Sequence, residues 1–296
     1  GWLNTENGYY YLNLSTGKMT VGWEKINNKW YYFQGNGVMA TGWVKDNGKY
    51  YYLLTDGTMH TGWVSIDNVY YYLGDSGAMA TGWVNMDNGW YYFDPNDGKC
   101  TVNLAREIND SWYMFGKDGK MLTGWQQVDG AYYYFHTDGR MLIGWLSDGT
   151  NSYYMDPANG RMSTGWKQIE GSYYYFNNSG HKLTGWIQVD GTYYYLNPSD
   201  KGRMAANTTL KIDGISYTFA ANGACTTSGG NALNVNGNTS GNNNTTAIPG
   251  SNSSNSSAPG SSTASSTSPS ASPGSTSGST TPGSSSSNQS INEYVS

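Results

Sequence analysis

The chain of 296 residues carries a net charge of −5, and its charged side chains are sparse and of mixed sign. Recognition of nucleic acid through its phosphates needs a basic stripe; none occurs here, which argues against that class of protein. No apolar run reaches membrane-spanning length. Aromatic residues are abundant instead, with 27 Tyr and 12 Trp, and all of these but Tyr294 precede residue 226. So many rings need an explanation beyond burial in a core.

Most of the chain is a tandem repeat. Segment 42–61, GWVKDNGKYYYLLTDGTMHT, recurs with variations: a Gly-Trp pair, a polar turn, a block of aromatic residues, and a Gly-containing connector that leads through Met to the next Gly-Trp. A short fixed period is typical of a solenoid whose units cannot bury a core alone. The Trp residues that open the units lie 20 or 21 positions apart wherever two units are adjacent: Trp2, Trp23, Trp43, Trp63, Trp83, Trp125, Trp145, Trp166 and Trp186.

Each unit predicts a β-hairpin, so the expected fold class is an all-β hairpin solenoid. With the Trp numbered as position zero, 62–66 is one strand, Asp67-Asn68 the turn and 70–73 the return strand. Asp-Gly pairs fill the same turn at 129–130, 190–191 and 213–214, and they favour a tight hairpin because Gly tolerates a positive φ. Two units, around 104–105 and 208–209, lack the Gly-Trp but keep a return strand. Counting both predicts eleven hairpins, the last of which caps the stack.

The composition changes sharply after residue 225. From residue 226 the sequence consists largely of Ser, Thr, Gly, Asn and Pro, and Glu293 is its only charged side chain. Such a segment lacks the apolar area that would offset the entropy of ordering it. We therefore expect a repeat domain over 1–225 and a disordered linker over 226–296.

Strand alternation predicts which positions are buried. Position ten is apolar in every unit that opens with Gly-Trp, from Leu12 and Phe33 to Leu196, and positions three and eight share its face. These three positions are expected to form the core. The Trp at zero shares its face with polar residues at position two, so we expect this Trp and the ring at position seven to remain on the outer face.

Outer rings from adjacent hairpins, with the connector Met beside them, would form a shallow cage. Such a cage suits a quaternary ammonium, which donates no hydrogen bond and is held by ring quadrupoles and dispersion. Each ring contact is worth about 0.5–2 kcal/mol, so a three-ring site should bind with a dissociation constant of about 1 mM. A row of such sites would bind a polymer by avidity. The alternative is that these rings only pack hairpin against hairpin.

Three motifs carry a family resemblance: GAMATGWV at 77–84, GWVKDNG at 42–48 and NGWYYF at 88–93. They resemble the choline-binding, cell-wall-binding repeats of bacterial surface proteins, and the resemblance covers residues 1–225. It implies a β-hairpin solenoid that is secreted and binds choline of teichoic or lipoteichoic acid at the cell surface. In that family the module usually anchors a covalently attached catalytic or adhesin domain.

The resemblance also implies the composition of each cage: the Gly-Trp ring and the first return-strand ring of one hairpin, with an aromatic residue of the next. The implied groups are Trp23, Trp30 and Tyr50; Trp43, Tyr50 and Tyr70; Trp63, Tyr70 and Trp90; Trp166, Tyr173 and Tyr193; Trp2, Tyr9 and Trp30; and Trp83 and Trp90 with Trp112. Met39, Met59 and Met79 are expected beside the rings. Ser152 and Ser216 replace the ring at position seven and should weaken the sites next to them.

Two other classes of binding or structural function stay open. The wider repeat superfamily includes glucan-binding and clostridial toxin repeats, which bind sugars, and 124–142 and 185–196 resemble those units more closely. A carbohydrate-binding module is therefore the first alternative, and a structural spacer or stalk is the second.

The sequence predicts no enzyme in this chain, so any catalytic domain would lie outside it. No nucleophile constellation or metal-ligand spacing occurs, and no cofactor is implied. The repeated acidic residues occupy turns, where turn formation explains them: Asp67, Asp87, Asp129 and Asp190. The histidines His60, His136 and His181 are isolated. Cys100 and Cys225 stand where other units have Met, and we expect them to be small apolar fillers.

Overall fold

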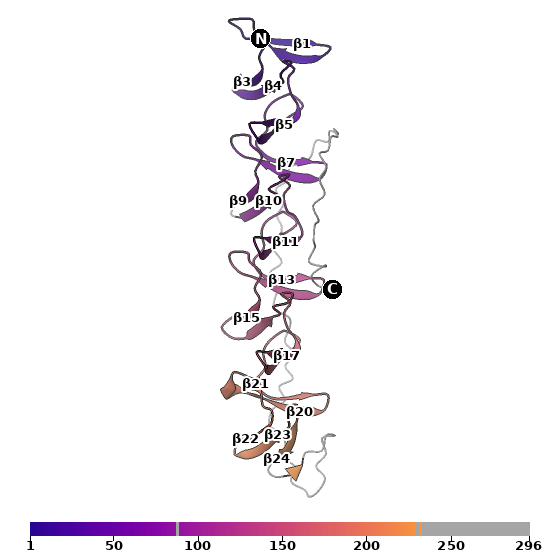
Figure 1. The fold of residues 1–296 in the computed structure, drawn as a ribbon, viewed down its shortest axis with the longest axis vertical. Coiled ribbons are helices and arrows are strands. Elements are labelled where there is room, and N and C mark those ends of the chain that lie inside the picture. The colour runs from indigo at the N-terminus through magenta and orange to yellow at the C-terminus, as the bar shows by residue number, and fades with distance from the viewer. Residues whose placement is uncertain (87–88, 229–230, 233–296) are drawn as a thin grey trace. The chain divides into compact units, whose positions relative to one another are not determined.

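The structure, a computed structural model, describes residues 1–86, 89–228 and 231–232. Within these residues the strands form eleven separate antiparallel sheets, and each sheet contains one hairpin of the repeat (Figure 1). The eleven predicted hairpins and the all-β class are thereby confirmed. A short 3-10 helix, η1 (Pro198–Asp200), lies in one connector. No helix in the described part of the chain has the length and apolarity to cross a membrane.

The described residues divide into two compact units, with the boundary in the chain between Leu122 and Thr123. Unit one holds six two-stranded hairpins: β1 (Trp2–Thr5) with β2 (Gly8–Tyr11), β3 (Gly22–Ile26) with β4 (Lys29–Phe33), β5 (Gly42–Asp46) with β6 (Lys49–Leu53), β7 (Gly62–Ile66) with β8 (Val69–Leu73), β9 (Gly82–Met86) with β10 (Gly89–Phe93), and β11 (Ala105–Ile108) with β12 (Ser111–Met114).

Unit two holds the remaining five hairpins, of which the last two carry extra strands. They are β13 (Gly124–Val128) with β14 (Ala131–Phe135), β15 (Gly144–Ser147) with β16 (Ser152–Met155), β17 (Gly165–Ile169) with β18 (Ser172–Phe176), β19 (Gly185–Val189) with β20 (Thr192–Asn197) and β21 (Arg203–Met204), and β22 (Thr208–Ile212) with β23 (Ile215–Phe219), β24 (Cys225–Ser228) and β25 (Asn231–Ala232). Strands β24 and β25 continue past residue 225, and the rest of the expected linker lies outside the described residues.

The hairpin turns have the geometry that their sequences predict. Asp67 and Asn68 have φ values of 51° and 64°, and Asp129 and Gly130 have 48° and 79°. Two consecutive left-handed residues define the turn whose twist matches that of the flanking strands. The corresponding Asp87-Asn88 turn lies outside the described residues.

The core is narrower than the alternation predicts. Position ten is fully buried from the second hairpin on, with Phe33, Leu73 and Phe176 at 0% exposure. Position eight is buried in several hairpins, for example at Tyr133. Position three is buried only in some of the described hairpins, as at Ile26, and half-buried in most others. A two-stranded hairpin covers little area by itself, so burial depends on how far the next hairpin reaches over it.

Within each unit, connectors tie a hairpin to the one before it. Met59 pairs with Leu53 of its own hairpin, and its N–H donates to the carbonyl of Trp30 in the preceding hairpin at 2.8 Å. The side chain of each such Met then lies over the glycine of the next connector. A Cβ added to Gly77 would stand 2.3 Å from Sδ of Met59. A side chain at this position would have to displace the thioether of Met59, and the positive φ disfavours one as well.

The connectors that begin with Asp-Pro are held by ion pairs. Arg106, on β11, bonds Asp94, and Lys167, on β17, bonds Asp156, so each basic side chain reaches from the following strand to a carboxylate that is largely shielded from solvent. Pro95 and Pro157 are exposed.

Candidate functional site

The Trp at position zero is a packing residue as well as a surface ring. The centroid of Trp43 lies 5.1 Å from Tyr52 of its own hairpin and 5.0 Å from Tyr71 of the next hairpin, both with T-shaped geometry. Trp23 makes the same two contacts, with Tyr32 at 5.1 Å and Tyr51 at 4.8 Å. The indole at position zero, which alternation places on the outer face, therefore also packs against the next hairpin. Alternation within one hairpin does not show that the next hairpin covers one side of the indole.

The ring at position seven stands at a right angle to this fixed indole. Three hairpins show the arrangement closely: Trp23 and Trp30 at 6.5 Å and 87°, Trp43 and Tyr50 at 6.5 Å and 87°, and Trp83 and Trp90 at 6.3 Å and 85°. Two of these position-seven rings are exposed, Trp30 at 42% and Trp90 at 44%, and the third, Tyr50, is half-buried. We call each such pair a corner. One wall is held by packing against the next hairpin, and the other is open to solvent.

The connector of the following hairpin borders each corner. The N–H groups of Met39, Met59 and Met79 donate to the carbonyls of Tyr9, Trp30 and Tyr50 at 2.7, 2.8 and 2.8 Å. These methionines thus lie beside the predicted rings, although their thioethers pack on connector glycines. The third ring of each cage, position seven of the next hairpin, remains a prediction.

Two lysines show that the open rings accept a cation. Nζ of Lys25 lies 5.9 Å from the centroid of Trp30, and Nζ of Lys45 lies 5.1 Å from that of Tyr50. Each lysine is the cross-strand partner of the ring, at position two. An ammonium within about 6 Å of a ring centroid is attracted by the quadrupole of the ring. The sequence analysis missed these contacts, although the hairpin register places positions two and seven opposite each other.

Most of the other predicted site residues also separate into exposed rings at position seven and packed indoles at position zero. Tyr9, Tyr70 and Tyr173 are exposed at 49%, 46% and 43%. The position-zero indoles contact position eight of the next hairpin: Trp2 with Tyr31 at 5.0 Å, Trp63 with Tyr91 at 5.1 Å, and Trp166 with Tyr194 at 4.9 Å. Tyr193 differs, since it is half-buried against the core of the last hairpin.

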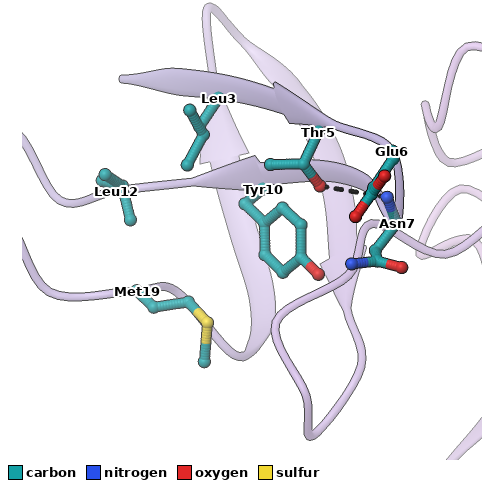
Figure 2. Close-up of a pocket in the computed structure, with 7 residues that line it drawn as sticks. All are labelled: Leu3, Thr5, Glu6, Asn7, Tyr10, Leu12 and Met19. Atoms are coloured by element: carbon teal, nitrogen blue, oxygen red, sulfur yellow. Dashed lines mark hydrogen bonds between the residues drawn. The ribbon is translucent and has the colours of Figure 1, made fainter.

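A recess of about 330 Å³ lies on the first hairpin, lined by Leu3, Thr5, Glu6, Asn7, Tyr10, Leu12 and Met19 (Figure 2). It offers one ring, Tyr10, rather than two walls. Tyr10 occupies position eight, and in the following hairpins this position receives the indole of the preceding unit, as Tyr51 receives Trp23. The recess is therefore a packing face and not a corner.

Comparison with known proteins agrees with the repeat pattern. The family described as choline-binding repeat matches residues 20–61, 60–104, 122–164 and 163–208, which together make up more than half of the chain. The chain belongs to the choline-binding repeat family. Among curated protein sequences none matches it.

Solved structures of choline-binding proteins are similar over most of this chain. CbpJ from Streptococcus pneumoniae TIGR4 is 31% identical, with a TM-score of 0.58, and the match covers 76% of this chain and 92% of that one. Choline binding protein F from Streptococcus pneumoniae is 29% identical, with a TM-score of 0.59 and coverages of 80% and 97%. The modular autolysin LytC from the same species is 27% identical, with a TM-score of 0.54 and coverages of 70% and 47%.

Proposed function

We propose that the choline-binding repeats of this chain hold choline in the corners between successive hairpins and thereby attach to choline-bearing teichoic or lipoteichoic acid of a bacterial cell wall. The observation that carries the proposal is the corner itself: a fixed indole with the position-seven ring at a right angle to it, found in three hairpins, in two of which that ring is exposed. The ammonium groups of Lys25 and Lys45 over two of these rings support a cationic ligand.

Choline fits a corner for chemical reasons. Its trimethylammonium group carries a positive charge but no N–H, so it gains little from hydrogen-bond acceptors and more from ring faces and thioethers. At about 0.5–2 kcal/mol for each ring, one corner holds free choline weakly. Several corners that engage one polymer bind it far more tightly, because every contact after the first is intramolecular.

The role of the module is to anchor an attached domain at the cell surface, without catalysis of its own. LytC is a modular autolysin, and this chain matches about half of its length, at 47%. That relation supports a division between a binding module and a separate catalytic or adhesin domain.

The test is a titration of the full chain with choline, followed by Trp fluorescence, beside a titration with an α-glucan oligosaccharide. We expect a saturable response to choline at millimolar concentration, weakened in Trp30→Ala/Trp90→Ala. Ile143→Ala, which removes an apolar side chain of 52% exposure that the proposal places outside the corners, is the matched control and should leave the response unchanged. A response to the glucan alone would move the chain to the carbohydrate-binding class, and no response to either ligand would favour a spacer.

A further inference from the structure

The eighth hairpin, β15 and β16, departs from the repeat at two positions that meet in space. Its Trp145 is 43% exposed, and Ser152 stands where most hairpins have the ring at position seven. In the connector that follows the ninth hairpin, Lys182 stands where most other connectors have Met. Both changes fall on one corner, the one that Trp145 and Ser152 would form.

The backbone delivers Lys182 to this corner as it delivers Met to the others. The N–H of Lys182 donates to the carbonyl of Ser152 at 2.8 Å, as that of Met162 donates to the carbonyl of Tyr132 at 2.8 Å. Lys182 also pairs with Phe176 of its own hairpin. Its stem then passes the glycine of the next connector, with Cε 3.6 Å from the place of a Cβ on Gly202. The lysine side chain therefore follows the path of a connector methionine.

The longer side chain ends in a charge over the indole. Nζ of Lys182 lies 5.3 Å from the ring centroid of Trp145, and it donates to the carbonyl of Lys201 at 3.0 Å. The side chain is thereby held at both ends, by the Ser152 carbonyl at its backbone and by the Lys201 carbonyl at its tip. Lys182 differs in this from Lys25 and Lys45, whose exposed side chains lie over position-seven rings and can move away when a ligand enters. Burial lowers the pKa of Lys182, which agrees with an ammonium partly withdrawn from water.

We propose that Lys182 is a built-in cation that occupies the place of choline on Trp145, so that this corner is closed to the ligand. The proposal rests on choline being the ligand of the other corners. A tethered ammonium competes at an effective concentration in the millimolar range or above, whereas free choline binds a corner only weakly. The missing ring at Ser152 lowers the affinity of choline further. The same contact also fastens the ninth connector to the eighth hairpin.

The experiment counts choline sites on the full chain by equilibrium dialysis in wild type, Ser152→Tyr and Ser152→Tyr/Lys182→Met. Restoring the ring alone should leave the number of sites unchanged, because the ammonium still fills the corner. Restoring both residues of the repeat should add one choline per chain. A control variant, Ser152→Tyr/Lys117→Met, removes an exposed lysine elsewhere and should match Ser152→Tyr. An added site in Ser152→Tyr alone, or none in Ser152→Tyr/Lys182→Met, would overturn the proposal.

A second measurement does not depend on the variants folding or on choline being the ligand. Amine-reactive labelling of the wild-type chain, read by mass spectrometry, should modify Lys182 several-fold more slowly than Lys117. Saturating choline should leave the rate at Lys182 unchanged. Equal labelling rates at the two lysines would refute the contact between Lys182 and Trp145. If Lys182 is labelled slowly in a chain that binds no choline, the proposed function is refuted, but the contact between Lys182 and Trp145 stands.

Discussion

Replacing each ring of one corner by alanine should separate folding from binding. The rings of Trp23 and Trp30 are perpendicular, with their centroids 6.5 Å apart, but their surroundings differ. Trp23 packs edge-on against Tyr32 at 5.1 Å and against Tyr51 of the next hairpin at 4.8 Å. Aromatic pairs of this kind contribute about 0.5–1.5 kcal/mol each beyond the buried area. Trp23→Ala should therefore lower the free energy of unfolding by about 1–3 kcal/mol from these two contacts alone.

Trp30→Ala should lower the free energy of unfolding by less than Trp23→Ala, because Trp30 makes one edge-on pair, with Trp23, worth about 0.5–1.5 kcal/mol; it should also reduce choline binding. The Trp30 side chain is 42% exposed, and the connector bond from Met59 uses its backbone carbonyl, which the substitution keeps. Loss of one ring contact of about 0.5–2 kcal/mol weakens this corner by about 2- to 30-fold. Both variants should weaken the corner, but Trp23→Ala should unfold at a clearly lower urea concentration than Trp30→Ala.

The assay is a urea titration followed by circular dichroism, paired with a choline titration of each variant. A double-mutant cycle between Trp23→Ala and Tyr51→Ala gives the energy of the contact between hairpins, which should be favourable by about 0.5–1.5 kcal/mol. Equal loss of stability in Trp23→Ala and Trp30→Ala would refute the division into a packing wall and a binding wall.

Three further predictions concern the connectors and the degenerate hairpin. In Gly62→Ala, at φ 85°, the new Cβ has no heavy atom within 4 Å, so the free energy of unfolding should fall only by the backbone strain of about 1–2 kcal/mol. In Gly57→Ala, at φ 81°, the new Cβ would lie 2.2 Å from a methionine sulfur, so the loss of stability in the same urea titration should be larger. Equal losses in the two variants would contradict the packing described above. Burial is the largest single effect on the pKa of Asp94 and raises it, but the bond from Arg106, the backbone N–H of Asn96 and the charge of Arg106 together outweigh burial, so the net pKa is lowered. The pair therefore stabilises the fold above the unfolded carboxyl pKa and loses this effect as pH falls through the folded value. Arg106→Met should lower the thermal midpoint at pH 7 and by much less near pH 3. Burial raises the pKa of Cys100 to about 12, so a thiol reagent at pH 8 should modify it far more slowly in the folded chain than in 6 M guanidinium, and equal rates would contradict its burial.

The sequence alone determined the repeat, the hairpins and the inward face. A period of 20 or 21 residues fixed the number of units, Asp-Gly and Asp-Asn pairs fixed the turns, and the apolar position ten fixed the core. These features follow from local backbone preferences and from alternation, which are properties of each unit by itself. The choline-binding family was evident for the same reason, since its motifs are local.

Only the tertiary structure decided what each aromatic ring does. Within one hairpin, positions zero and seven share a face, and nothing local distinguishes Trp43 from Tyr50. The next hairpin distinguishes them, because it places Tyr71 against the indole and leaves the position-seven ring at the open side of the corner. Lys182 reaches Trp145 from 37 residues away by the same stacking. Contacts between neighbouring units depend on how the hairpins stack, and the pattern within a unit does not specify that geometry.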